Sequence, residues 1–455
     1  MTFSRLLIAN RGEIAVRIQR AARELGMTTI QVYSAADADS LAVKMADKAV
    51  NIGPPHAARS YLNISAILEA AEATGAEAIH PGYGFLSENA AFADAVEAAG
   101  LVFVGPQGST IRVMGDKAAA RAAAEKAGVP VVPGSEGRVA DFGRARAAAA
   151  EIGYPVMIKA SAGGGGRGIR VVESAGGLES AFDQASAEAK AAFGDSGLYL
   201  EKFIARARHI EVQILGDGRD AIHCYERECS LQRRRQKVWE EAPSPALNPD
   251  AREALCACAV QLTRSVGYRS AGTLEFLYDD TTGRFYFIEM NTRIQVEHPV
   301  TEMTTGVDLV REMLRIAAGA PLAYKQSDIR LRGHALEARI NAEDPAQNFR
   351  PSPGTVTDYR APGGAGTRFD TLLYQGCQVS PFYDSLIGKL IVWDETRGAA
   401  LARMRRALGE VVVEGIATTA PLHQALVEDE AVQAGAFHTR WLEDWLSSRQ
   451  RRAEP

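Results

Sequence analysis

The first 115 residues alternate short apolar segments with longer amphipathic ones, and this order restricts the possible folds more than any other feature of the chain. We expect strands at 6–9, 28–33, 76–79 and 101–104 and helices at 13–25, 62–74 and 90–99. Strands that alternate with helices form a parallel, doubly wound sheet. Because ligands bind beyond the carboxyl ends of such strands, residues 10–12 and 80–89 are expected to border a ligand crevice.

Later changes of pattern divide the rest of this α/β chain, whose 455 residues suffice for about three domains. We predict the following segments: a Rossmann-like domain at 1–115, a linker helix and connection at 116–134, a small glycine-rich unit at 135–203, a strand-rich unit at 204–332, and a C-terminal α+β domain at 333–455. Within them we expect helices at 116–127 and 397–409 and strands at 334–340 and 354–360.

Glycines fill most of residues 163–168, between two strand-like segments at 156–160 and 169–172. A Rossmann turn or a P-loop would need a helix after the glycines, whereas a second strand predicts a β-hairpin with a long glycine tip. Such a tip lets backbone N–H groups approach phosphate oxygens, and Lys159 would add a positive charge. The alternative is a flexible surface hairpin without a ligand.

Glu275 and Glu289 lie on two strand-like segments joined by a turn at 279–283, which predicts an antiparallel hairpin. They are fourteen positions apart, so their carboxylates face each other if Thr282 is the middle of the turn. Directly opposed like charges repel, and a divalent cation between them would remove the repulsion. Oxygen ligands favour Mg²⁺ or Mn²⁺. Two solvated acids on an exposed face are the alternative.

The strand of Glu289 is expected to continue to residue 297, with a polar side chain at every second position. Glu289, Asn291, Arg293, Gln295 and Glu297 would then share one face. Acid, amide and base alternate along it, which indicates a lined site rather than a solvated face. We expect a metal at one end, an anion at Arg293, and Glu297 as a general base beside the anion.

Residues 233–237 carry four cations in five positions, a density that can indicate nucleic-acid binding. Glu228, Glu240 and Glu241 flank the stretch, and the whole chain has a net charge of −5, which argues against that function. A cationic loop that serves a triphosphate or bicarbonate fits better. A solvated run of charge is the alternative.

The five cysteines are odd in number and show no zinc-binding spacing, so we expect reduced thiols in a cytoplasmic protein. No apolar run approaches the roughly 18 residues that a membrane span needs. We therefore expect neither a membrane nor a nucleic acid as a partner.

Taken together, these features resemble the biotin carboxylases, members of the ATP-grasp family. The resemblance covers nearly the whole chain and rests on motifs at 10–15 (Asn-Arg-Gly-Glu-Ile-Ala), 80–89 (His-Pro-Gly-Tyr-Gly-Phe-Leu-Ser-Glu-Asn), 114–117 (Met-Gly-Asp-Lys), 163–168, 295–302 and 339–344 (Arg-Ile-Asn-Ala-Glu-Asp). It implies an ATP-grasp fold with the glycine-rich unit as a lid. It also implies ATP-dependent carboxylation of biotin by bicarbonate, through carboxyphosphate.

The resemblance also implies which residues act. It implies ATP contacts from Lys117, Lys159, Gly165, Gly166, Glu201, Lys202, Phe203, Ile204, His209, Gln232, Arg235, Glu275, Leu277 and Glu289. Bicarbonate would contact Lys237, Arg293, Gln295, Val296 and Glu297, and biotin would contact Tyr83 and Arg339. Mg²⁺ or Mn²⁺ would be held by Glu275, Glu289 and Asn291, and the catalytic residues would be Lys237, Arg293, Glu297 and Arg339.

Three positions depart from the family pattern. Arg235 stands where His or Asn is usual, and Ala162 stands where another lid glycine is frequent. The dimer face of the family is represented by Arg20, Glu24 and Arg368, but Ala365 replaces an expected aromatic residue. We therefore expect a homodimer with a weakened interface.

The chain lacks the Met-Lys-Met site at which biotin is usually attached. We expect biotin on a separate biotin carboxyl carrier protein, with separate carboxyltransferase subunits, in an acetyl-CoA or other acyl-CoA carboxylase. The alternatives are a component of a two-subunit pyruvate carboxylase, another ATP-grasp ligase that forms C–N bonds, and a nucleotide-binding regulatory subunit without chemistry.

Overall fold

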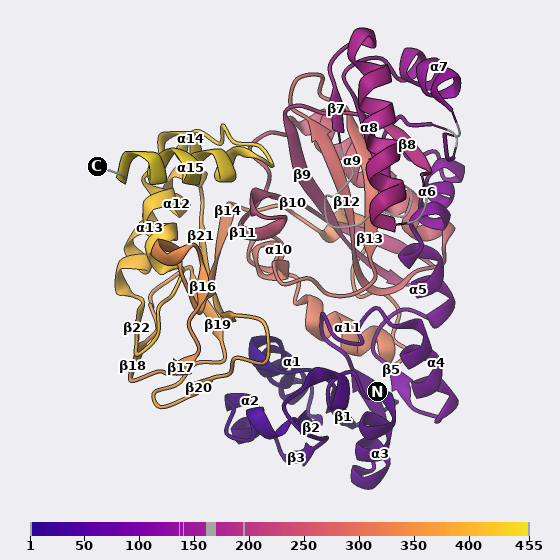
Figure 1. Cartoon of the computed structure of the whole chain (residues 1–455). Helices are drawn as coiled ribbons and strands as arrows, with labels where there is room; N and C mark the ends of the chain where they lie inside the picture. Colours follow the sequence, from indigo (N-terminus) through magenta and orange to yellow (C-terminus); the bar gives the residue numbers. More distant parts are fainter. Residues whose placement is uncertain (1, 136, 140, 161–169, 194–195, 454–455) are drawn as a thin grey trace. The chain divides into compact units, whose positions relative to one another are not determined.

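The computed structural model, drawn in Figure 1, describes residues 2–453 except 136, 140, 161–169 and 194–195. Its chain divides into two compact units. The first unit comprises residues 1–129, 208–276 and 289–455, and the second comprises 130–207 and 277–288. Within the described part of the chain, no helix is both long and apolar enough to cross a membrane.

The N-terminal sheet of the first unit is parallel throughout and confirms the doubly wound prediction. Its strands follow the order β3-β2-β1-β4-β5, with bounds Lys48–Asn51, Thr28–Tyr33, Arg5–Ile8, Ala78–His80 and Val102–Phe103. The helices of this region are α1 (Gly12–Glu24), α2 (Leu41–Met45), α3 (Ile64–Thr74), α4 (Ala90–Ala98), α5 (Gly108–Gly115) and α6 (Lys117–Lys126).

Strand β1 shows why the sheet is covered on both faces. Leu6 and Ile8 pack in a core that includes residues of α1, whereas Leu7 packs in a separate core with Phe92 of α4. Alternate residues of a strand point to opposite faces, so an uninterrupted apolar strand needs helices on both sides.

A second, longer sheet lies mostly in the first unit, and its strands pair antiparallel from β9 through β10, β11, β14 and β21 to β19. Its strand order is β13-β12-β9-β10-β11-β14-β21-β19. The bounds in chain order are β9 (Ala207–Asp217), β10 (Ala221–Arg233), β11 (Gln236–Ala242), β12 (Arg269–Asp279), β13 (Phe285–Asn291), β14 (His334–Asn341), β19 (Thr367–Thr371) and β21 (Leu386–Asp394). Strand β12 ends three residues before Thr282 and β13 begins three residues after it. Thr282 is therefore the middle of the turn, as the predicted hairpin requires.

Helices and short strands complete this unit. The helices are α9 (Pro249–Ser265), α10 (His298–Thr305), α11 (Leu309–Ala317), α12 (Arg397–Glu410), α13 (Ala420–Val427), α14 (Glu430–Gln433) and α15 (Trp441–Ala453). The short strands are β15 (Glu343–Asp344), β16 (Arg350–Pro351), β17 (Gly354–Thr355), β18 (Asp358–Arg360), β20 (Gln378–Val379) and β22 (Val412–Glu414).

The predicted strand at 354–360 is wrong, because the chain changes partners in its middle. Strand β17 pairs with β20, whereas β18 pairs with β22. Between them, the Val356 N–H donates to the Cys377 carbonyl and the Thr357 N–H donates to the Glu414 carbonyl. No local sequence signal marks this change of partner.

The second unit contains a three-stranded antiparallel sheet of order β7-β6-β8. Its strands are β6 (Val156–Ala160), β7 (Arg170–Val172) and β8 (Leu198–Lys202), and its helices are α7 (Phe142–Ile152) and α8 (Ala175–Phe193). The antiparallel pairing of β6 with β7 confirms the two strands of the predicted hairpin. Gly165, Gly166 and Ala162 lie outside the described residues.

The expected continuation of β13 to residue 297 is also wrong. The strand ends at Asn291, and α10 begins at His298 with Pro299 in its first turn. The N–H groups of His298 and Val300 donate to the carbonyls of Gln295 and Glu297, which bends the chain into the helix. The period-two pattern therefore ends in an irregular segment at 292–297.

Buried Glu241 joins β11, β14 and the start of α12. Its carboxylate contacts His334 Nε2 at 2.6 Å and accepts from Arg397 Nε and Nη2 at 2.7 and 3.0 Å. Burial opposes the charge, but the Arg397 guanidinium and the hydrogen bond from His334 lower the pKa of Glu241 to about 2. The carboxylate thus stabilises the fold only while it is ionised.

We predict that E241Q lowers the free energy of unfolding by about 3 kcal/mol at pH 7. A depressed pKa in the folded state stabilises the protein above the ordinary value of 4.5, and this contribution is lost as the pH falls toward 2. Urea denaturation at pH 7, 4 and 3 should therefore show a shrinking difference from wild type. E428Q, at an exposed ion pair with Arg405, is the matched control. A difference that stays constant with pH would contradict the prediction.

Candidate active site

The guanidinium of Arg227 is completely buried at the centre of the long sheet. It donates to Glu211 Oε1 at 2.5 Å and Gln213 Oε1 at 2.7 Å, two neighbours on β9. It also donates to Thr273, Gln295 and Thr301 at 3.1, 3.0 and 2.9 Å. Because every donor direction has a partner, Arg227 fixes strand β12, the irregular segment and α10 relative to β9.

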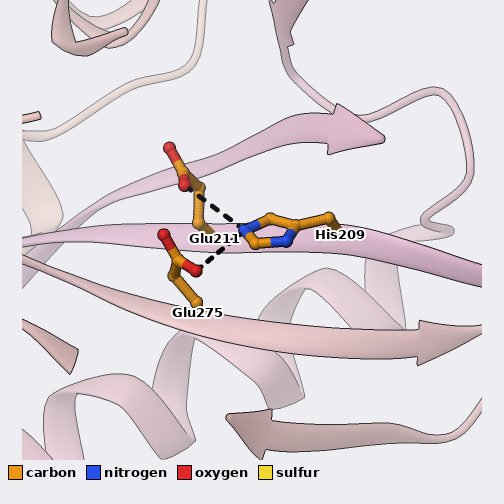
Figure 2. A group of neighbouring side chains, drawn as sticks. All are labelled: His209, Glu211 and Glu275. Carbon is orange, nitrogen blue, oxygen red and sulfur yellow. Dashed lines mark ion pairs between the residues drawn. The ribbon is translucent and has the colours of Figure 1, made fainter. Parts of the chain in front are cut away.

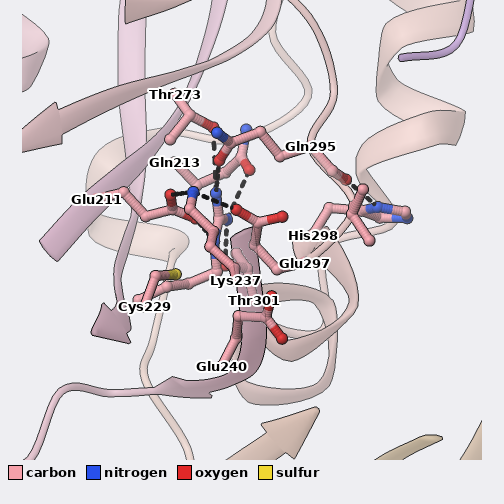
Figure 3. A network of polar contacts seen from close by, with 12 residues as sticks. Glu211, Gln213, Cys229, Lys237, Glu240, Thr273, Gln295, Glu297, His298 and Thr301 are labelled. Atoms are coloured by element: carbon pink, nitrogen blue, oxygen red, sulfur yellow. Dashed lines mark hydrogen bonds and ion pairs between the residues drawn. The ribbon is translucent and has the colours of Figure 1, made fainter. Parts of the chain in front are cut away.

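Lys237 lies in the middle of three carboxylates, as Figure 3 shows for two of them. Its ammonium contacts Glu211 at 2.5 Å, Glu297 at 2.6 Å and Glu275 at 3.0 Å. Burial disfavours the ammonium, but these carboxylates prevail and hold the pKa of Lys237 well above its usual value. A permanently charged ammonium among acids is suited to bind and orient an anion that enters between them.

Arg339 binds Glu297 from the other side. Its Nη2 donates to Glu297 Oε2 at 2.8 Å, and its Nε donates to Glu240 Oε1 at 2.5 Å. Burial and Glu211 raise the pKa of Glu297, but Lys237 and Arg339 outweigh them and lower it below the usual value. Glu297 is therefore an ionised carboxylate at neutral pH, the state that a general base requires.

His209 faces two carboxylates, Glu211 and Glu275 (Figure 2). Its Nε2 lies 3.1 Å from Glu275 and 3.8 Å from Glu211. Burial lowers the pKa of His209, but the charge of Glu275 dominates the opposing contributions and raises it to about 9. The ligand atoms of these three residues lie within 4.8 Å of one another.

Glu289 adds a second carboxylate beside Glu275. Burial and the charge of Glu275 raise the pKa of Glu289, so the expected repulsion between them is present. The Asn291 amide donates to Glu275 Oε1 at 2.9 Å. Oxygen ligands and two mutually repelling acids fit a divalent cation such as Mg²⁺ or Mn²⁺.

Arg293 forms its ion pair with Glu88, outside this group of acids. Its Nε donates to Glu88 Oε2 at 2.8 Å, and its Nη2 donates to Asn291 Oδ1 at 3.0 Å. Gln295 instead donates to Glu275 at 2.9 Å. The expected single face of alternating polar residues is therefore absent, because the strand has already ended.

Tyr83 follows strand β4 of the N-terminal sheet. Its hydroxyl donates to buried Glu13, and the charge of Arg339 acts on the Tyr83 hydroxyl. Burial and Glu13 raise the pKa of Tyr83 well above its usual value, so the hydroxyl stays protonated. Tyr83 and Arg339, the two residues expected to contact biotin, therefore interact electrostatically.

The basic stretch does not act as one loop. Arg233 lies over the Phe349 ring, 3.8 Å from its centroid, and the backbone N–H of Arg234 donates to Glu443 at 2.9 Å. Arg235 is exposed at the hairpin turn with a positive φ of 66°. The Gln232 amide donates to the Cys229 carbonyl at 2.8 Å.

The remaining expected nucleotide residues belong to the second unit, except Lys117 at the first position of α6. Lys159 forms an ion pair with Glu201, and Lys202 donates to the carbonyls of Gly153 and Tyr154, each at 2.9 Å. The Phe203 N–H donates to the Pro155 carbonyl at 3.1 Å. Ile204 is buried and Leu277 is half-buried.

Family models match most of the chain. The biotin carboxylase N-terminal domain matches residues 2–111, the ATP-binding domain of the carbamoyl-phosphate synthase L chain matches 116–325, and the biotin carboxylase C-terminal domain matches 337–444. The biotin carboxylase of Pseudomonas aeruginosa is 56% identical over 97% of this chain and 98% of its own.

The chain belongs to the biotin carboxylase family. It is therefore an ATP-dependent ligase that carboxylates biotin, and its α/β fold is the predicted ATP-grasp fold. One of the pyruvate carboxylase subunits of Methanothermobacter thermautotrophicus is 51% identical over 97% of this chain and 90% of its own. The biotin carboxylase domain dimer of Hydrogenobacter thermophilus 2-oxoglutarate carboxylase, solved with MgADP and bicarbonate, has a TM-score of 0.87 and 50% identity over 98% of both chains.

Sequence reasoning missed three residues of this biotin carboxylase site. Glu211 and Arg227 were assigned no role, and Glu240 entered only as an acid that flanks the basic stretch. In the structure, Glu211 contacts both Lys237 and Arg227, and Glu240 contacts Arg339. Glu211 had one signal, the alternation of polar residues along 209–213, which a single half-buried strand also produces.

We predict that the imidazole of His209 titrates near pH 9 and that E275Q lowers this value, because the variant removes the attractive charge. Nuclear magnetic resonance of protein labelled at histidine Cε1 measures both titrations. His423 serves as the internal control, since burial lowers its pKa to about 4 and it contacts neither acid. An unchanged His209 titration in E275Q would contradict the assignment.

Proposed function

We propose that this biotin carboxylase transfers the carboxyl group of bicarbonate to biotin on a separate carrier protein, as the first half-reaction of an acetyl-CoA or other acyl-CoA carboxylase. One observation supports the chemistry above all: Glu297 is ionised and lies between Lys237, at 2.6 Å, and Arg339, at 2.8 Å. A base with cations on both sides is suited to an anionic substrate.

The proposed bicarbonate site contains Lys237, Arg293, Gln295, Val296 and Glu297. Lys237 would exchange one of its carboxylate partners for bicarbonate, and Arg293 would exchange Glu88. Glu297 takes the proton of bicarbonate, whose oxygen then attacks the γ-phosphorus of ATP. The bond from that phosphorus to the bridging oxygen of ADP breaks, which leaves carboxyphosphate and ADP.

The second step consumes carboxyphosphate. Its carbon–oxygen bond to phosphate breaks and releases CO₂, and the phosphate accepts the N–H proton of the biotin ureido group. Arg339 stabilises the ureido enolate, whose nitrogen attacks CO₂ to give carboxybiotin. Tyr83 is proposed to contact the same biotin ring, and the charge of Arg339 acts on its hydroxyl. Exclusion of water is essential because carboxyphosphate is hydrolysed readily.

Nucleotide and metal roles complete the proposal. In the first unit we assign ATP contacts to Lys117, His209, Gln232, Arg235, Glu275 and Glu289. In the second unit we assign them to Lys159, Glu201, Lys202, Phe203, Ile204 and Leu277, and outside the described residues to Gly165 and Gly166. Glu275, Glu289 and Asn291 would hold Mg²⁺ or Mn²⁺, which neutralises phosphate oxygens when bound.

The segments at 1–115, 116–134, 135–203, 204–332 and 333–455 are proposed as the domains of this enzyme. A homodimer is also proposed, and the dimer of the Hydrogenobacter thermophilus domain supports it. A two-subunit pyruvate carboxylase is the second candidate assembly, favoured by the 51% identity to the Methanothermobacter thermautotrophicus protein. Proteins that copurify with the chain decide between the assemblies.

Bicarbonate-dependent ATP cleavage, measured with and without free biotin, tests the proposed reaction. Stimulation by biotin supports it. Turnover that does not respond to biotin, or the absence of any turnover, would contradict it.

We predict that E289Q reduces kcat at least a hundredfold with little loss of stability, because it removes one anionic ligand of the metal from a half-buried position. Steady-state ATP cleavage and thermal melting measure the two effects. E410Q is the control, because Glu410 pairs with Arg406 on the surface. Near-normal ATP cleavage in E289Q would reject the metal assignment.

R339A is predicted to reduce carboxylation of biotin more than biotin-independent ATP cleavage, since the enolate forms only after carboxyphosphate. Loss of Arg339 also raises the pKa of Glu297. The comparison is therefore made across a series of pH values, so that a loss caused by protonation of Glu297 is recognised by its recovery at higher pH. Equal losses in both reactions would remove Arg339 from the enolate role.

A further inference from the structure

One row of charged residues crosses the long sheet from β14 to β19. Lys389 on β21 lies directly opposite Arg339 on β14 and directly opposite Asp370 on β19. Directly paired residues of antiparallel strands share a face of the sheet. The Lys389 side chain therefore lies on the face that carries Arg339, where α10 packs on β14 and β21.

The ammonium of Lys389 is completely buried, with 0% exposure. Its Nζ donates to the Val296 carbonyl at 2.8 Å and contacts Glu13 Oε1 at 3.1 Å. Glu13 lies in the first turn of α1, and Val296 lies in the irregular segment before α10. Lys389 thus joins two segments that are far apart in the sequence.

Each of these partners adjoins or contacts a residue that is proposed to bind a substrate. The Val296 carbonyl stands between Gln295 and Glu297, whose side chains contact Glu275, Lys237 and Arg339. The segment has no strand ladder, so its carbonyls need donors from elsewhere. The other partner, Glu13, accepts the hydroxyl of Tyr83.

Burial raises the pKa of Glu13, and Lys389 is the strongest group that opposes this rise. Without Lys389, the buried Glu13 would lose the cation that opposes this rise, and its hydrogen bond with Tyr83 would be affected. A buried ion pair is weak as a source of stability, because apolar residues of similar volume often serve a core as well. The contacts of Lys389 therefore point to orientation rather than to stability.

We propose that Lys389 is a positioning residue. It holds the backbone at Val296–Glu297 at a fixed distance from the Glu13–Tyr83 pair, so that bicarbonate and biotin bind at the right distance from each other. This inference rests on the proposed roles of Glu297 and Tyr83. Lys389 contacts the Val296 carbonyl and Glu13, so it acts on the substrates through these two groups.

The test compares K389M with the double variant K389M/E13Q. Met preserves the length of the side chain but removes its charge and its donors. K389M alone leaves Glu13 without a cation and is expected to lower the melting temperature. The second change removes that unpaired charge, so the double variant is expected to melt close to wild type. K44M, at an exposed lysine near Tyr374, is the matched control.

Steady-state kinetics on the full chain then separates positioning from stability. In the double variant we expect KM for bicarbonate and KM for free biotin to rise about tenfold, equal to about 1.4 kcal/mol each, while KM for ATP changes less than twofold. K44M should match wild type in every constant. A double variant with wild-type melting and wild-type KM for both substrates would overturn the inference.

The wild-type enzyme separates this inference from the function on which it rests. If wild type shows no ATP cleavage stimulated by biotin, the proposed function fails and the positioning role fails with it. If wild type is stimulated and the double variant binds both substrates normally, only the positioning role of Lys389 is rejected.

Discussion

The pairing of buried charges around Lys237 determines the rest of the site. Glu211, Glu275 and Glu297 could not remain ionised together in a dry interior, because like charges at these distances repel strongly. Lys237 lies between them, while Arg227 and Arg339 bind two of them from outside. This balance leaves a carboxylate base beside fixed cations, which is what deprotonation of bicarbonate needs. It also allows an anion or a metal to replace one partner without leaving a charge unpaired.

The fold could be predicted where local patterns and topology agree. Strand β1 is apolar at every position after Arg5, so a sheet covered on both faces follows from the sequence. The hairpin of Glu275 and Glu289 was also predictable, because two strand-like segments flank a turn rich in Asp, Thr and Gly. The predicted strand through residue 297 failed because hydrogen bonds into α10 override the period-two pattern after Asn291. Pro299, two residues after Glu297, was the available warning of a helix start.

The contacts of the site could not be predicted from spacing alone. Arg227 and Gln295 are 68 residues apart, and Lys389 and Val296 are 93 apart. Such pairs form because β10, β21 and the segment before α10 meet on the long sheet, and no local pattern encodes that meeting. The resemblance to biotin carboxylases supplied candidate roles for Lys237 and Arg339, but it did not indicate which acids they contact. The strand registers answer that question, because Glu240 lies opposite Glu337, two residues from Arg339.

A crystal structure of the enzyme with bicarbonate and ADP tests the central claim most directly. The account predicts a bicarbonate ion bonded to the Lys237 ammonium, with one oxygen within hydrogen-bond distance of Glu297 and with the contact between Arg293 and Glu88 broken. If bicarbonate bound away from Glu297 while Lys237 kept all three of its carboxylate partners, the assignment of Glu297 as the base would be wrong.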